Sequence, residues 1–192
     1  MDAKAIEGLG KRLKGFLGEF ADCFGRREPA ENLHTYIQGQ LSDLPRKSIE
    51  PMALHFGTPP RTLQQFLSLA HWDEDRMRQR MHERVANGHG EADAVGLIDE
   101  TSYLKKGRQT PGVKRQHCGA VGKKDNCTVS VHLAYAAPRG FRVLLDGELF
   151  LPEDWSEDRE RCRKAGIPQD MVYRPKWKIA LELRDRAVAN GV

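Results

Sequence analysis

The stretch Ala94-Val95-Gly96-Leu97-Ile98-Asp99-Glu100 decides the fold, because the chain changes there from helical to strand spacing. A short run of apolar residues of this kind is typical of a buried strand. We expect the strand to end at the two acids, with Asp99 on the face that also carries Val95 and Leu97. A carboxylate at that place indicates either a functional site or a solvated strand end, and the residues alone leave both open.

Further extended segments follow this stretch. Pro138-Arg139-Gly140 predicts a turn into an extended segment, residues 141–151. Within that segment, Asp146-Gly147 fits either a tight hairpin between two short strands or a bulge in one longer strand, and the sequence does not decide between them. The strand before the turn is predicted from alternating apolar residues, namely Cys127, Val129, Val131, Leu133 and Tyr135.

Two helical segments end the chain. Trp155-Ser156 opens a charged stretch that runs to Ala165, and Gly166-Ile167-Pro168 closes it. A last helix is predicted from Pro175 to Asn190, with Gly191 at the stop position. Its inner side is expected to comprise Trp177, Ala180, Leu181, Leu183 and Val188.

Before residue 88 the spacing is helical throughout. Apolar residues recur every three or four positions, which predicts helices with one buried face each. A charged helix from His71 to Asn87 closes this part, and the glycine-rich stretch 87–90 is the expected domain boundary. The first stripe comprises Ile6, Leu9, Leu13, Phe16, Leu17, Phe20 and Phe24, and the second comprises Leu33, Tyr36, Ile37 and Leu41.

Residues 46–70 have the spacing of a helix-turn-helix. An apolar stretch from Ile49 to Phe56 meets Gly57, and a second helix restarts at Thr58-Pro59-Pro60 with Thr58 as the expected cap. Two helices joined by any capped turn have the same spacing, so a purely structural helix pair is the alternative. The exposed face of the second helix would present side chains that reach phosphates and base edges in a major groove, namely Arg61, Gln64, Gln65 and Ser68.

The positive charge is concentrated in the middle of the chain. The formal net charge is +4, and residues 94–152 hold nine Lys and Arg against five Asp and Glu. Such a cluster suits contacts with DNA phosphates, although a solvated basic loop has the same composition. Its cations, in a span without a single acid, are Lys105, Lys106, Arg108, Lys114, Arg115, Lys123 and Lys124.

Composition excludes several classes of protein. No apolar stretch approaches the length of a membrane span, and the first 24 residues alternate charged and apolar residues, unlike a signal peptide. The four cysteines lie far apart with no C-x-x-C pair, which predicts reduced thiols and no zinc ribbon. We therefore expect a cytoplasmic protein with no membrane partner.

Several ordered segments together resemble the DDE superfamily of insertion-sequence transposases, in particular the group named after insertion sequence 701. The resemblance runs from about Phe20 to the last residue. It rests on LSDLPRKSIEPMA, PPRTLQQFLS and WDEDRMR, then on VGLIDETSYLKKGRQTPGVKRQHCG, DNCTVSVHLAYA, LLDGELFLPEDW, AGIP and YRPKWKIALEL. It favours the DNA-binding reading of Arg61, Gln64 and Gln65, and of the basic residues Lys105, Lys106, Arg108, Lys114 and Arg115.

Members of this family have a ribonuclease H-like catalytic domain in which three acidic side chains hold two divalent ions, Mg²⁺ or Mn²⁺. Asp99 matches the first acidic position, so the resemblance implies that it is catalytic and a metal ligand. Glu100 faces the other side of a regular strand and is expected to be structural or to contact the basic loop. Asp146 and Glu148 sit where the family has no metal ligand.

The resemblance also implies an α+β fold with an incomplete catalytic domain. We expect a helical, helix-turn-helix-like domain at 1–88 and a truncated ribonuclease H-like domain with a mainly antiparallel sheet at 91–192. In complete members, the helix that matches residues 175–190 is followed by a strand with the second acid and later by a helix with the third. The metal would then be held weakly, and the outer strand edge would await the missing C-terminal segment or a second chain.

The expected function is therefore that of a DDE transposase, which cuts and joins DNA at the terminal repeats of its element, in a chain that is inactive by itself. The alternative is a non-catalytic, DNA-binding regulator of transposition that uses the helix-turn-helix. A nonfunctional remnant is a third possibility. In either of the first two cases the protein would be nucleoid-associated when it is bound to DNA.

Overall fold

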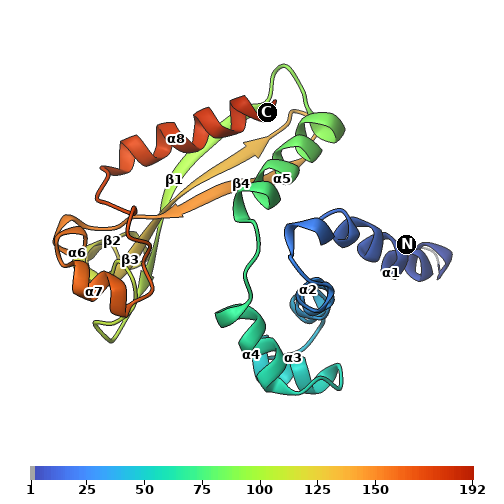
Figure 1. Ribbon diagram of the computed structural model, residues 1–192. Coiled ribbons are helices and arrows are strands. Elements are labelled where there is room, and N and C mark those ends of the chain that lie inside the picture. Colours follow the sequence, from blue (N-terminus) through green and yellow to red (C-terminus); the bar gives the residue numbers. More distant parts are fainter. Residues whose placement is uncertain (1–2) are drawn as a thin grey trace. The chain divides into compact units, whose positions relative to one another are not determined.

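The computed structural model describes the backbone of residues 3–192 and the side chains from residue 8 onward. The chain forms two compact units, Met1–Arg80 and Met81–Val192. The first holds helices and the second holds an antiparallel sheet with further helices (Figure 1). This architecture confirms the predicted α+β class with a mainly antiparallel sheet. Among the described residues no helix is both long enough and apolar enough to cross a bilayer.

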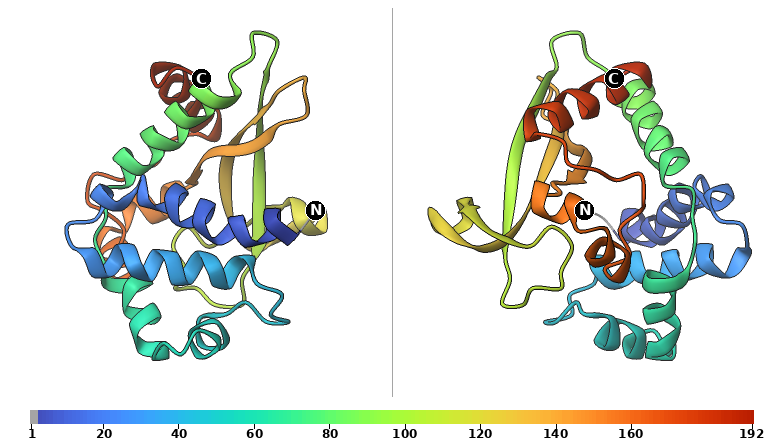
Figure 2. Two further views of the ribbon diagram at one scale, coloured as in Figure 1. Left: turned by 90° about the vertical axis from the view of Figure 1, so that its right-hand side faces the viewer. Right: turned by 60° about the vertical axis from the view of Figure 1, so that its left-hand side comes forward.

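Short helices that pack on one another make up the first unit (Figure 2). Its core holds the rings of Phe24, Phe66 and Trp72, with centroids 5.4 to 6.4 Å apart. The side chain of Ile6, part of the predicted first stripe, lies outside the described residues. The elements are α1 (Ala3–Gly18), the 3-10 turn η1 (Ala21–Cys23), α2 (Arg27–Leu41), α3 (Ile49–His55), α4 (Pro60–Leu69) and α5 (Glu74–His89), which extends into the second unit.

The turn between α3 and α4 differs from the prediction at one residue. Gly57 has a φ of 65°, a left-handed conformation that favours glycine. Thr58 does not cap α4, because the helix begins at Pro60 and the N-cap position is Pro59. The backbone N–H of Thr58 instead donates to the carbonyl of Ala53 at 2.9 Å, which continues the end of α3.

A four-stranded antiparallel sheet forms the centre of the second unit, with the long strand β3 (Lys123–Ala136) in the middle. β3 pairs with β1 (Val95–Leu104), β2 (Lys114–Cys118) and β4 (Arg142–Leu149). The 3-10 turn η2 (Gly119–Val121) joins β2 to β3. β4 is one continuous strand whose register shifts opposite Leu133 and Ala134, so Leu145 is an extra residue beside Asp146. The structure thus has the bulge and not the hairpin.

The prediction for β1 was wrong in two respects. The strand continues through Asp99 to Leu104, because β3 is long enough to pair with it as far as Cys127. It is also exposed along almost its whole length. Among residues 3–192 it pairs with β3 alone, so β1 is an edge strand, and its open outer edge agrees with the prediction. Asp99 therefore lies in the middle of an edge strand and not at the tip of a buried one.

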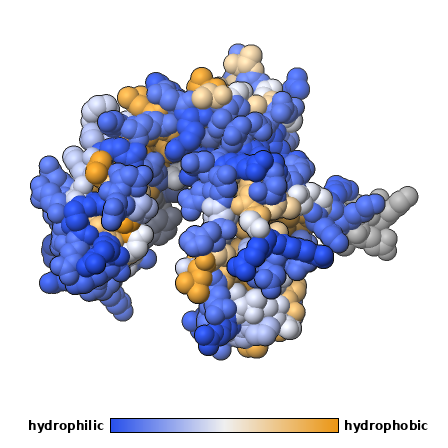
Figure 3. Space-filling model, viewed as in Figure 1, coloured by the Kyte–Doolittle hydropathy of each residue, from blue (hydrophilic) through white to orange (hydrophobic). Residues whose placement is uncertain are grey.

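The last helix, α8 (Lys176–Ala189), packs on β3 and β4 with only part of the predicted inner side, namely Leu183 and, partly buried, Ala180 (Figure 1). Its buried side chains are Ile179, Leu183 and Ala187, which meet Val131 and Leu133 of β3. Trp177, Leu181 and Val188 are 66%, 41% and 62% exposed, contrary to the prediction that they face inward. In Figure 3, hydrophobic residues reach the surface in the region of α8.

Residue spacing explains why α8 turns its tryptophan outward. Helical residues that lie two positions apart point in nearly opposite directions, so Trp177 points away from the core that Ile179 enters.

The predicted charged helix before α8 is two short helices, α6 (Glu153–Glu157) and α7 (Arg159–Lys164), which are separated at Asp158. Between them lies the smaller core around Trp155, whose Nε1 donates to the carbonyl of Val113 at 2.7 Å.

Candidate functional site

An open groove of about 480 Å³ lies beside Asp99 in the second unit, a size within the ~300–1,000 Å³ of small-molecule sites. Four parts of the chain line it: the middle of β1, the end of β2 with η2, Val131 of β3, and the first turns of α8. Its polar and aromatic side chains are those of Asp99, Glu100, Ser102, His117, Lys176 and Trp177. The groove is the candidate site because it contains the acid that the sequence selects.

Asp99 is an exposed carboxylate held against the backbone of its own strand. Its Oδ1 accepts the backbone N–H of Glu100 at 2.7 Å. Its neighbour across the ladder is His132 of β3. Among the side chains of residues 8–192, none forms an ion pair with this carboxylate. Asp99 is therefore free to meet a cation from solvent, as a hard divalent ion with oxygen ligands requires.

Glu100 has a structural role on the opposite face of β1. It lies across the ladder from Val131, which faces α8, and its Oε2 accepts from Nζ of Lys176 at the start of α8. Lys176 also lies over the ring of Phe150, with its Nζ 5.2 Å from the centroid. The partner of Glu100 is thus the first turn of α8 and not the basic loop that was one of the two predicted contacts.

The two acids of β4 are engaged in ion pairs with α8 and its leading loop. Asp146 pairs with Arg186, and Glu148 pairs with Arg174. Arg174 also pairs with Glu182. Burial lowers the pKa of Arg174, but its hydrogen bonds and charge contacts with Glu148 and Glu182 outweigh burial and raise it. These ion pairs hold α8 and the loop before it against the sheet.

His117 and Ser102 join the groove through a contact that the sequence did not reveal. The backbone N–H of Gly119 donates to Oγ of Ser102 at 3.2 Å, which brings η2 against β1. His117, at the end of β2, then forms one wall of the groove. β2 reads Lys-Arg-Gln-His-Cys and has no apolar alternation, so no strand was predicted there. Only the pairing with β3 makes it a strand.

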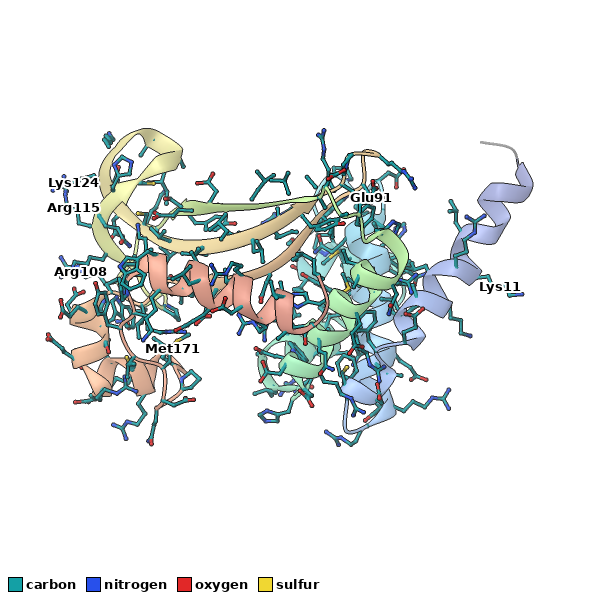
Figure 4. All side chains as sticks on the ribbon, turned by 90° about the horizontal axis from the view of Figure 1, so that it is seen from above. Lys11, Glu91, Arg108, Arg115, Lys124 and Met171 are labelled. Atoms are coloured by element: carbon teal, nitrogen blue, oxygen red, sulfur yellow. The ribbon has the colours of Figure 1, made fainter. Side chains whose placement is uncertain are left out.

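The basic residues lie around the hairpin of β2 and β3. His117 pairs with Lys124 in the register, so Arg115, His117 and Lys124 share one face of that hairpin. Arg108, Arg115 and Lys124 lie at the same end of the sheet, far from Glu91 at the other end (Figure 4). Lys106, Arg108 and Arg115 are exposed, whereas Lys105 is half-buried. Lys114 is paired with Asp154 at 2.9 Å, which occupies part of its charge.

The exposed face of α4 belongs to the first unit. Leu63 and Phe66 are buried, and Arg61, Gln64 and Gln65 are exposed, as the predicted orientation of this helix requires. Ser68 is exposed as well, but its Oγ donates to the carbonyl of Gln64 at 2.8 Å. A DNA-binding role for this face remains a prediction.

Asp99 could supply one oxygen ligand to a divalent ion, but the described side chains do not complete a metal site around it. Among the described residues no three His, Cys, Asp or Glu side chains gather as a metal site. The four cysteines are buried, free thiols. Asp99 supplies an uncommitted carboxylate, and the oxygen atoms of water, DNA or further acids would have to complete the coordination.

Comparison with known proteins identifies relatives of the whole second unit and most of the first. The family model of the DDE superfamily endonucleases matches residues 19–192. Over 154 residues the chain is 33% identical to the probable transposase for insertion sequence element IS701 of Microchaete diplosiphon. That alignment covers 80% of this chain and 37% of the relative. No solved structure matches the chain at a significant level.

Proposed function

Because this chain belongs to the DDE superfamily of endonucleases, we propose that it provides the DNA-binding surfaces and the first metal-binding carboxylate of an insertion-sequence transposase. The observation that carries the proposal is the state of Asp99. It is the acid of the groove without an ion pair among residues 3–192, and it lies in the same unit as the exposed cations of the β2–β3 hairpin. Metal-dependent phosphoryl transfer needs carboxylates that hold divalent ions beside the phosphate, and Asp99 would supply one of them.

In this proposal Asp99 would hold the divalent ion, Mg²⁺ or Mn²⁺. When bound, such an ion stabilises the negative charge that develops on the attacking and leaving oxygens of a phosphodiester. Glu100 would position Asp99 indirectly, because its ion pair with Lys176 fixes β1 to α8. The hydrogen bond from the backbone N–H of Glu100 would hold the carboxylate of Asp99 ready for the ion.

The DNA would be held by two separate groups of side chains. Arg108 and Arg115, with Lys105, Lys106 and Lys114, would neutralise phosphates next to the groove, an interaction that gains from counterion release. Arg61, Gln64 and Gln65 on α4 would read the terminal repeats, because arginine and glutamine can form paired hydrogen bonds with base edges. The two groups lie in different units, so each is testable by itself.

We also propose that residues 1–192 alone bind DNA without cutting it. Two-metal cleavage needs several carboxylates around the ions, and Asp146 and Glu148 are already committed to Arg186 and Arg174. The remaining acids would come from further polypeptide, which would also cover the open edge of β1. Without that further polypeptide, the chain would act as the non-catalytic regulator, because element ends that it occupies would be protected from cutting.

The test is a DNA-binding and nicking assay with the full chain and a duplex that carries the terminal repeat flanking its gene. We expect a shifted complex without nicks, and we expect Mn²⁺ to strengthen binding of the unaltered chain. Asp99→Asn should remove this Mn²⁺ effect and leave metal-free binding unchanged. Asp170→Asn is the matched control, because Asp170 is an exposed acid in a loop away from the groove residues.

Three results would decide against parts of the proposal. Equal affinity for the terminal repeat and a scrambled duplex would rule out sequence recognition by α4. A Mn²⁺ effect that survives Asp99→Asn, or that is lost equally in Asp170→Asn, would rule out Asp99 as the specific metal ligand. Nicking that depends on Asp99 would show that these residues form a catalyst by themselves, contrary to the proposed inactivity.

A further inference from the structure

The three tryptophans of the chain occupy very different surroundings. Trp155 is completely buried and its indole N–H donates to Val113. Trp72 packs against Phe24 and Phe66. Trp177 is 66% exposed, and within the described residues its indole forms no hydrogen bond or ring contact. Single exposed apolar side chains are common on protein surfaces, so the surroundings of Trp177 decide whether its exposure has a function.

The position of Trp177 indicates which chemical class of partner it could bind. It lies in the first turn of α8 on the side away from the core, and it lines the same groove as Asp99 and His117. Two lysines flank it in sequence, Lys176 and Lys178, and Lys178 is exposed. Lys176 is paired with Glu100, so Lys178 is the exposed cation beside the ring. An aromatic ring beside a cation, in the same unit as a basic hairpin, is a composition found on surfaces that bind single-stranded nucleic acid.

We propose that Trp177 stacks on an unpaired nucleobase of the DNA strand whose backbone passes Asp99. The inference rests on the proposed function and deepens it, because it specifies that the groove takes an extruded or single-stranded nucleotide. In a duplex each base is already stacked on its neighbours, so only an unpaired base has a free face for the indole. The groove, at about 480 Å³, has room for a group of that size.

Charge in the groove is compatible with a nucleotide. The ion pair of Glu100 with Lys176 neutralises one acid, and Asp99 would be compensated by the divalent ion of the proposed function. His117, which also lines the groove, carries a ring N–H that can donate to a phosphate oxygen. Its neighbours on the same hairpin face, Arg115 and Lys124, continue the path of a phosphate backbone.

A competing occupant would be a protein segment that covers the outer side of α8. Trp177 and Leu181 lie one helical turn apart on that side, and Val188 continues the stripe. The affinity for a protein partner depends on the buried apolar area. Leu181 would then contribute to that affinity as Trp177 does, and a leucine at position 177 would retain most of it. Stacking requires an aromatic ring, so phenylalanine but not leucine could replace Trp177.

The experiment measures affinity for two fluorescent DNAs in Ca²⁺: a terminal-repeat duplex with a single-stranded dT overhang and the same duplex with blunt ends. Trp177→Ala should weaken overhang binding by about tenfold or more, in line with the loss of one stacked base. Trp177→Leu should weaken it equally, and Trp177→Phe should stay within about threefold of the unaltered chain. Leu181→Ala should change neither affinity, and the blunt duplex should bind all of these variants alike.

A second readout is tryptophan fluorescence. Overhang DNA should quench the emission of the unaltered chain and of Leu181→Ala, and this quenching should disappear in Trp177→Phe although binding persists. Normal overhang binding by Trp177→Leu, or equal losses for Trp177→Ala and Leu181→Ala, would overturn the stacking proposal in favour of a protein partner. The double variant Lys106→Ala with Arg115→Ala separates the two proposals: if it binds both DNAs normally, it is the proposed function that fails.

Discussion

Asp146 of β4 and Arg186 of α8 form an ion pair, with Oδ2 and Nε 2.8 Å apart, and the Asp146 side chain is only 2% exposed. A buried carboxylate is stable as an anion only when it is paired and hydrogen-bonded. Asp146 meets both conditions, because its Oδ1 also accepts the backbone N–H of Gly147. Asp146, which the family resemblance places where no metal ligand occurs, therefore connects a strand to a helix.

Breaking the Asp146–Arg186 pair should destabilise the second unit. We expect Arg186→Ala to lower the free energy of unfolding by about 3 kcal/mol, because it leaves a buried anion without its main partner. Asp146→Asn should cost less, and the double variant should cost less than the sum of the two. Urea unfolding followed by circular dichroism gives these values; additive effects would mean that the pair contributes nothing.

A cross-strand contact should make Gly147 sensitive to the smallest substitution. A Cβ at this position would lie 2.4 Å from Nδ1 of His132, which is too close for any side chain. Gly147→Ala should therefore destabilise the chain by about 1–3 kcal/mol through overpacking. In a His132→Ser background the same change should cost much less. Thermal melting of the four chains tests this, and an equal cost in both backgrounds would exclude the contact as the cause.

Stability should fall at alkaline pH because of one thiol. Burial, and then the neighbouring Cys118, raise the pKa of Cys127 from 9.0 to about 11. The neutral thiol is thus favoured in the folded state. Its contribution is complete below pH 9 and is lost as the pH rises from 9 to 11, by up to about 3 kcal/mol. Cys127→Ala should reduce the slope of the free energy of unfolding against pH between pH 9 and 11, as measured by urea unfolding. An unchanged slope would mean that other groups cause the loss of stability at alkaline pH.

Two neighbouring cations of β2 should contribute unequally to DNA binding. Arg115 is exposed without an ion pair among residues 3–192, whereas Lys114 is engaged with Asp154. Each phosphate contact contributes about 0.9 to the slope of log affinity against log salt. We expect Arg115→Ala to reduce the slope for duplex DNA by about 1 and Lys114→Ala to reduce it clearly less. Equal reductions would mean that the Asp154 pair opens when DNA binds.

The open edge of β1 should make the isolated chain prone to association. Val95, Leu97 and Ile98 are exposed on this strand, and unpaired apolar edges template pairing with another chain. Leu97→Lys should reduce concentration-dependent association measured by light scattering, because a charge on an edge strand opposes pairing. Leu54→Lys is the control, since Leu54 is equally exposed but lies on α3. An equal reduction by both variants would indicate a general solubility effect instead.

Local patterns in the sequence determined most elements of this fold. The alternation from Cys127 to Tyr135 predicted β3, and Pro138-Arg139-Gly140 predicted the turn into β4, where Gly140 has a φ of 93°. Period-two and period-3.6 patterns report which face of an element is buried, so they carry that information wherever an element has one covered face. The same patterns, with the ordered segments of the family, pointed to Asp99.

Only the tertiary structure decided which residues share the groove. β2 has no apolar alternation, and its pairing with β3 together with the contact of Gly119 with Ser102 places His117 near Asp99. The outward direction of Trp177 was not predictable either, because α8 carries apolar residues on both sides and the sheet selects one of them. Contacts between distant segments depend on shape and register, which local spacing does not encode.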